Sequence, residues 1–166
     1  MNPYTFFDFY EYLSGLTASN KLAQEQGFHF CTCTGITALE GVLTKLRSKS
    51  NFLCCTDTTV DDTWRNGQGG WYKRRSIIVF ILMRYKQGDM DDWRAKMVIA
   101  RELFRQFQSK LLVDSQQLLS DMTYLDIDTF HSQELGAANI NGATGLMFEL
   151  SCSEPTNIVY NADEWE

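Results

Sequence analysis

The stretch WYKRRSIIVFILMRY, residues 71–85, decides the fold. It contains seven apolar residues in a row, in which Ile77, Val79 and Ile81 alternate with Ile78 and Phe80. Successive side chains of a strand point to opposite faces, so both faces of this strand are apolar. The pattern therefore predicts a strand at the centre of a sheet that is covered on both sides.

The segment before this strand predicts the other limb of a long β-hairpin. NFLCCTDTT, residues 51–59, is rich in side chains that favour strands. The connection contains Asn66, Gly67, Gly69 and Gly70, residue types that tolerate the positive φ angles of tight turns. We therefore expect two long antiparallel limbs joined near these residues.

The segment after the strand predicts a long helix. Gly88 ends the strand, Asp89 is a good N-cap, and Asp91 and Asp92 lie in the first turn, where the helix dipole favours negative charge. Apolar residues then recur at three- and four-residue steps through about residue 112, namely Trp93, Met97, Ala100, Phe104, Phe107 and Leu111. This stripe predicts a helix that packs one face on the sheet.

The N-terminal part predicts a helix, a strand and a second helix. Aromatic residues at helical spacing predict a short amphipathic helix over residues 4–14 that ends near Gly15. The alternating run FHFCTCT, residues 28–34, predicts a strand. Thr37 and Glu40 then form a capping-box pair at the start of the second helix.

The last third predicts two more strands, near residues 122–130 and 145–153, with Pro155 ending the second. The expected order is α-β-α-β-β-α-β-β, and the length of 166 residues fits one domain. We predict a single α+β domain over residues 1–166, with a mixed, mainly antiparallel sheet, a long β-hairpin and two or three packed helices. Its ends are an aromatic helix and strand in residues 1–35 and an apolar tail in residues 155–166.

The formal charge of −6 is unevenly distributed along the chain. Residues 1–50 carry four acids and four bases, residues 51–110 carry seven acids and eleven bases, and residues 111–166 carry ten acids and no base. The last third would repel a phosphate backbone, so we expect no direct nucleic-acid binding. A positive middle and a negative end suit a head-to-tail contact between identical copies.

The sequence differs from those of exported and membrane-spanning proteins. Its first basic residue is Lys21, and acids interrupt the aromatic start, unlike the order of a signal peptide. The longest apolar run is far too short to span a membrane. We therefore expect a cytoplasmic protein without membrane contact, in which the cysteines are reduced and packed: Cys31, Cys33, Cys54, Cys55 and Cys152.

Two cysteine-based alternatives stay open. Cys31 and Cys33 share a strand face and could hold a metal with other cysteines, although the spacing is not that of a zinc ribbon. Either could act as a nucleophile with His131, although no local signature supports this, and His29 also lies outside any motif. Packed, inert thiols are the simpler interpretation.

The hairpin also carries an acidic segment, Asp57, Asp61 and Asp62, followed by Asn66. These residues could hold a hard cation, but they lack the regular spacing of a calcium-binding loop. A solvated hairpin limb is the simpler interpretation. We therefore predict a protein that is not an enzyme and uses neither a cofactor nor a metal.

The strongest candidate site is a contact surface at the hairpin end, with the C-terminal tail as a second one. Clustered Trp, Tyr and Arg residues are typical of interface hot spots. The alternative is that Trp64 and Trp71 merely pair across the hairpin. The predicted contact residues are Trp64, Arg65, Trp71, Tyr72, Lys73, Arg74, Arg75, Tyr160 and Trp165.

Over residues 36–153 the predicted architecture resembles that of the tail-terminator and tail-completion proteins of tailed phages. The N-terminal aromatic helix and the FHFCTCT strand go beyond what a minimal member needs. The segments that carry the resemblance are NFLCCTDTTVDDTWRNGQGGWYKRRSIIVFILMRY, then DMDDWRAKMVIARELFRQFQSKLL, then GATGLMFELSC.

This resemblance implies a non-enzymatic structural subunit of a phage-like tail or related contractile assembly. Its copies would form a ring that caps or completes the tail and binds other tail or neck proteins. Such a protein is expected in the bacterial cytoplasm during assembly and in the virion tail if it is phage-derived. The alternative is a small-ligand or protein-binding module with a pocket between sheet and helices.

Overall fold

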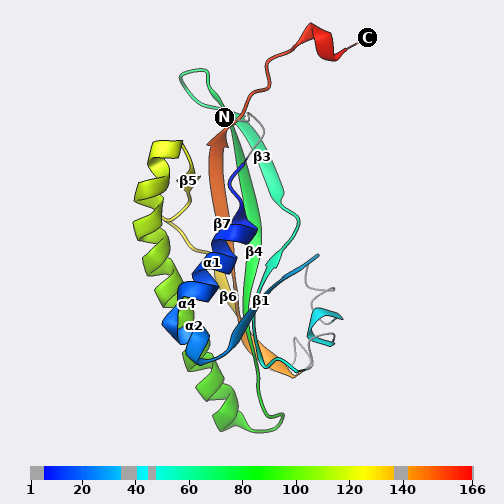
Figure 1. Cartoon of the computed structure of the whole chain (residues 1–166), viewed down its shortest axis with the longest axis vertical. Helices are drawn as coiled ribbons and strands as arrows, with labels where there is room; N and C mark the ends of the chain where they lie inside the picture. The colour runs from blue at the N-terminus through cyan, green and yellow to red at the C-terminus, as the bar shows by residue number, and fades with distance from the viewer. Residues whose placement is uncertain (1–5, 35–40, 45–47, 137–141, 166) are drawn as a thin grey trace.

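A computed structural model describes residues 6–34, 41–44, 48–136 and 142–165 (Figure 1). In this part of the chain seven strands form one open, mainly antiparallel sheet, which confirms the predicted α+β class. The strands are β1 Phe28–Cys33, β2 Asn51–Thr56, β3 Val60–Arg65, β4 Trp71–Arg84, β5 Tyr124–Leu125, β6 Ser132–Leu135 and β7 Ala143–Pro155. The helices are α1 Phe9–Ser19, α2 Lys21–Glu25 and α4 Met90–Leu118, with 3-10 turns η1 Leu119–Asp121 and η2 Ala162–Glu164.

β4 is the central strand, as its two apolar faces predict. It pairs with β2 and β3 on one edge and with β7 on the other. Of the strand pairs that the structure describes, only β1 and β2 run parallel. Ile77, Val79 and Ile81 belong to the core shared with α1 and α4. Phe80 and Leu82 belong to a second core on the opposite face. Burial on both sides explains why this stretch is apolar at every position.

The predicted hairpin is present, but its first limb is divided into β2 and β3. From Cys55 to Val60 the limb advances five residues, whereas its partner positions on β4 advance only three, from Val79 to Ser76. The extra residues form a bulge, which interrupts the pairing. Both strands still face the same edge of β4.

α4 begins as predicted and ends later. The side chain of Asp89 accepts hydrogen bonds from the backbone N–H groups of Asp91 and Asp92, at 3.1 and 3.0 Å. The helix continues to Leu118 rather than to about residue 112. Its last turns are held by a tertiary contact, because the Tyr12 hydroxyl donates to the buried Asp114 carboxylate at 2.8 Å.

The N-terminal prediction needs correction. α1 begins at Phe9, where the Asp8 side chain caps it, and it runs through Gly15 to Ser19, so Gly15 does not end the helix. Asn20 separates α1 from α2, a short helix that the pattern did not predict, and caps it by accepting from the backbone N–H of Ala23 at 2.8 Å.

The two elements that follow were predicted more closely. β1 confirms the FHFCTCT strand. Of the predicted second helix, residues 41–44 are helical, and the capping pair Thr37 and Glu40 lies outside the described residues.

The last third differs most from expectation. The strand predicted near residues 122–130 is reduced to the two residues of β5, and β6 was not predicted. Both short strands pair with the same edge of β7. β7 itself confirms the last predicted strand and its end at Pro155. Gly145 of β7 lies so close to β4 that an added Cβ would be 1.9 Å from the Ile81 carbonyl oxygen.

Candidate functional site

The hairpin end is an ordered turn. Asn66 exchanges backbone hydrogen bonds with Gly70 and Gly69, at 2.8 and 3.0 Å. Its side-chain oxygen also accepts from the N–H groups of Gln68 and Gly70. Gly69 has a φ of +93°, the conformation that the glycine-rich connection predicted. The hydrogen bonds therefore hold the aromatic residues beside the turn in fixed positions.

Aromatic side chains line one face of this end. Trp64 and Tyr72 are directly opposite in register and stack, with ring centroids 5.3 Å apart, and Tyr124 of β5 meets Tyr72 edge-on at 6.1 Å. Trp71 lies opposite Arg65. The alternative that Trp64 and Trp71 pair with each other is therefore wrong. Both tryptophans stay exposed, by 44% and 37% respectively.

The basic run beside the turn is engaged within the chain. Lys73 forms an ion pair with Asp61 at 3.1 Å, Arg74 with Asp126 at 2.8 Å and Arg75 with Glu154 at 3.0 Å. Burial opposes the ionisation of Asp61, but hydrogen bonds from Thr59 and Lys73 outweigh it, and the pKa of this carboxyl is lowered. The positive middle of the sequence is thus partly neutralised by the acidic last third. Nothing in the sequence marked Asp126 and Glu154 as partners.

Arg65 differs from the other basic residues of the hairpin. It is the last residue of β3, it is exposed, and no ion pair is formed by its guanidinium within the described residues. An exposed cation beside Trp64 and Trp71 is the residue combination that interface hot spots favour. Arg65 is therefore the basic residue of the hairpin most available to a partner.

The C-terminal arm, residues 156–165, leaves the body at the same end (Figure 1). The Thr156 N–H donates to the Trp71 carbonyl at 2.9 Å, and the later hydrogen bonds described for the arm stay within it. Tyr160 and Trp165 pack on each other with centroids 6.2 Å apart, yet they remain 71% and 68% exposed. Their apolar surface is unprotected in a single copy.

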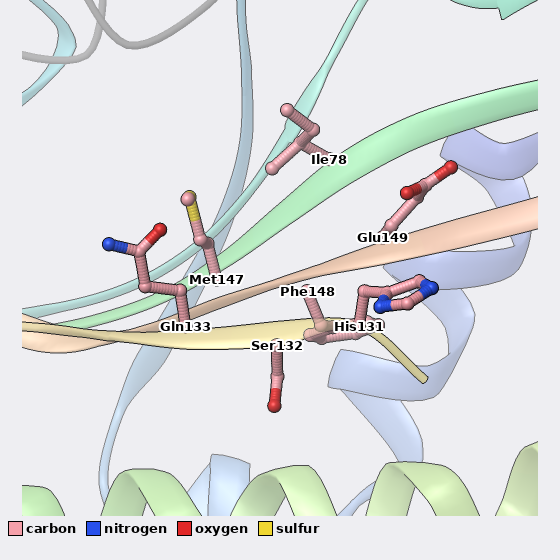
Figure 2. Close-up of a pocket in the computed structure, with 7 residues that line it drawn as sticks. All are labelled: Ile78, His131, Ser132, Gln133, Met147, Phe148 and Glu149. Carbon is pink, nitrogen blue, oxygen red and sulfur yellow. The ribbon is translucent and has the colours of Figure 1, made fainter. Parts of the chain in front are cut away.

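A shallow cavity of about 270 Å³ lies on the sheet beside β6. Figure 2 shows the side chains of Ile78, Met147 and Glu149 rising from the face turned away from α4. His131 and Gln133 border the same space. The arrangement combines an apolar floor with polar groups at the rim, the usual composition of a small-ligand site.

Within the described residues the cysteines form neither a metal site nor a nucleophile paired with His131. Cys31 and Cys54, opposite each other on β1 and β2, form a disulfide, which corrects the expectation that all cysteines are reduced. Cys33, Cys55 and Cys152 are buried. Burial raises the pKa of the Cys55 and Cys152 thiols to about 12, so neither is a nucleophile at neutral pH.

His131 lies too far from Cys31 and Cys33 to form a catalytic pair with either of them. His131 precedes β6, and three strands separate β6 from β1, which carries Cys31 and Cys33. Strands are spaced by about 4.8 Å, so His131 and these cysteines are roughly 20 Å apart. In the described residues no group of three or more His, Cys, Asp and Glu side chains is placed to hold a metal ion.

The acidic residues of the hairpin also do not converge. Asp61 faces Lys73, Asn66 closes the turn, and the backbone N–H of Asp57 donates to Cys33. The exposed Asp57 and Asp62 are part of no cluster of three or more potential metal ligands within the described residues. A hard-cation site is not formed by them.

No protein-family model matches the chain, and no curated protein matches its sequence significantly. Across the residues that the structure describes, no helix combines the length and the apolar character needed to cross a membrane.

Proposed function

We propose that this protein is a non-enzymatic assembly subunit that associates with copies of itself. The observation that carries the proposal is the exposure of aromatic residues on both faces of one end, where the hairpin turn and the C-terminal arm both project. Trp64, Trp71, Tyr160 and Trp165 contribute to it. Large exposed apolar groups are unfavourable in water unless a partner covers them, and tryptophan and tyrosine dominate interface energetics.

The proposal extends to a tail-terminator or tail-completion subunit of a phage-like tail or related contractile assembly. The long hairpin, the single dominant helix and the closing strand β7 are the features in which the sequence resembles such proteins. The partners would be other copies in a ring and further tail or neck proteins. The protein would assemble in the bacterial cytoplasm and remain in the virion tail if it is phage-derived.

The test is the mass in solution by light scattering as a function of protein concentration. Self-association predicts a species of several 19.1 kDa subunits that dissociates on dilution. The variant Trp71→Ala/Trp165→Ala should weaken it, and Val98→Ala, which truncates an exposed residue of α4, should not. A monomer at every concentration would contradict the proposal. Detection of the protein in purified tail particles tests its place in such an assembly.

A small-ligand-binding module is the second candidate, and the cavity beside β6 favours it. This cavity lies on the sheet face away from α4, not between sheet and helices as first expected. A ligand there would place apolar atoms on Ile78 and Met147 and polar atoms near Glu149. Thermal-shift screening with small polar-apolar compounds tests this, and Met147→Trp, which fills the cavity, should abolish any shift.

A further inference from the structure

We propose that residues 157–160 of the arm of one copy add as a β-strand to the free edge of β3 in a second copy. The inference rests on the proposed self-association and specifies its contact. It follows from an unpaired strand-forming segment, a matching unpaired edge, and a distribution of charge that selects one orientation.

The donor segment is Asn157-Ile158-Val159-Tyr160. β-branched and aromatic residues favour strands, and these four residues are exposed, with Val159 exposed by 78%. The segment has no strand partner within the described chain. A sequence that favours pairing is thus held out from the body without a strand partner, and its Val159 N–H donates to the Asn157 side chain at 3.0 Å.

The acceptor is the outer edge of β3. Among the described residues this strand pairs only with β4, and all six of its residues, Val60–Arg65, are exposed. An edge strand presents a row of backbone donors and acceptors without partners, which is a template for an added strand. β3 contains no proline or lysine, and its Asp61 carboxylate is turned toward Lys73. The devices that protect this edge are Asp62 and the bulge before Val60, so the edge is open from Thr63 to Arg65.

Charge selects a parallel orientation. β3 ends at the exposed Arg65, and the arm continues after Tyr160 to Asp163 and Glu164. In a parallel arrangement these acids lie beside the guanidinium. In an antiparallel arrangement they lie toward the start of β3, near Asp61. Only the parallel arrangement brings opposite charges together. In the antiparallel arrangement the acids of the arm would be repelled by Asp61.

The acceptor must belong to another copy. The arm leaves β7 at Pro155, which is opposite Tyr72 on β4, and β3 lies beyond β4. The outer side of β3 is three strand spacings away, about 14 Å. Thr156 alone connects Pro155 to the donor segment. The two steps from Pro155 to Asn157 span at most about 7 Å, half of the distance needed. The arm therefore cannot pair with its own β3.

The experiment compares Val159→Pro with Val159→Ala in the full chain, using sedimentation and light scattering. Proline removes a backbone donor and fixes φ, so strand addition should be lost, whereas alanine keeps the backbone hydrogen bond. The arm is exposed, so the body should unfold at the same denaturant concentration in both. We expect the proline variant to be monomeric and the alanine variant to associate.

A charge exchange tests the orientation. Arg65→Glu alone, and Asp163→Arg/Glu164→Arg alone, should each weaken association, and their combination in one chain should restore it. Association of the wild type that survives Val159→Pro unchanged would overturn strand addition and leave the proposed function standing. A wild type that never associates would instead refute the proposed function itself.

Discussion

Arg75 and Glu154 form the ion pair whose removal should be most damaging to the fold. The guanidinium donates to the Glu154 carboxylate at 3.0 Å and to the Phe7 carbonyl at 2.6 Å. It also lies 4.9 Å from the centre of the Phe6 ring and 5.2 Å from that of Phe9. Both carboxylate oxygens of Glu154 accept from the Phe7 N–H. The pair therefore ties the chain before α1 to β4 and β7.

The expected magnitude follows from burial. The two side chains are only 13% and 10% exposed. Removing one member of a buried pair leaves the other charge without compensation and costs about 3–5 kcal/mol. We expect Arg75→Met and Glu154→Gln each to lower the free energy of unfolding by about 3 kcal/mol. The double variant Arg75→Met/Glu154→Gln should lose much less than the sum of the two single losses, because no charge is left buried.

The assay is urea unfolding, with the midpoint and slope fitted for each variant. The matched control is Arg74→Met, because Arg74 and Asp126 form a pair on the other face that is 42% and 39% exposed. Exposed pairs contribute about 0–1 kcal/mol, so this variant should be close to wild type. Equal, small effects at Arg74 and Arg75 would refute the distinction drawn from burial.

Three further predictions concern Gly145, Asp89 and the pair of buried thiols Cys55 and Cys152. Gly145→Ala should destabilise the protein by about 3 kcal/mol or more in urea unfolding, because a Cβ there meets the Ile81 carbonyl and the φ of +145° suits only glycine. Asp89→Ala should lower stability by about 1 kcal/mol through the lost N-cap, and Asp89→Asn should retain most of it. The Cys55 and Cys152 thiols have pKa values raised to about 12 from 9. The unfolded chain releases these protons first, so stability should fall between pH 9 and 12, by about 1.4 kcal/mol per pH unit for each thiol, and replacing both with alanine should flatten this fall.

The elements that the sequence predicted well are those whose pattern is set by burial. β4 is apolar on both faces because a core covers each of them, and the stripe on α4 is long enough to define its helical period. The N-cap at Asp89 is a local interaction between residues two and three apart. Such signals lie within one stretch of chain and do not depend on the rest of the fold.

The elements that were missed depend on distant partners or are very short. β6 is largely polar, and it is a strand because it pairs with β7. β5 has two residues, which is too few for any alternation to be visible. α2 has only five residues, and its start is set by the Asn20 cap rather than by an apolar period. Periodicity cannot detect elements of this kind.

The candidate site was predicted in part for the same reason. Trp64, Arg65 and Trp71 were identified from composition, and the structure exposes them at the hairpin end. The roles of Arg74 and Arg75 could not be foreseen, because their partners are 52 and 79 residues away in the chain. Charge counted along a sequence does not show which charges face each other once the chain folds.

This pairing changes the expected response of self-association to salt. The sequence alone suggested a contact driven by a positive middle and a negative end, which added ions would screen strongly. Lys73, Arg74 and Arg75 are already paired within the chain, so strand addition would rest mainly on backbone hydrogen bonds and apolar contacts, with one charged contact at Arg65. We therefore expect association to weaken only modestly between low and high salt. A complete loss of the oligomer at high salt would show that charge carries the contact, and would count against strand addition as its main source.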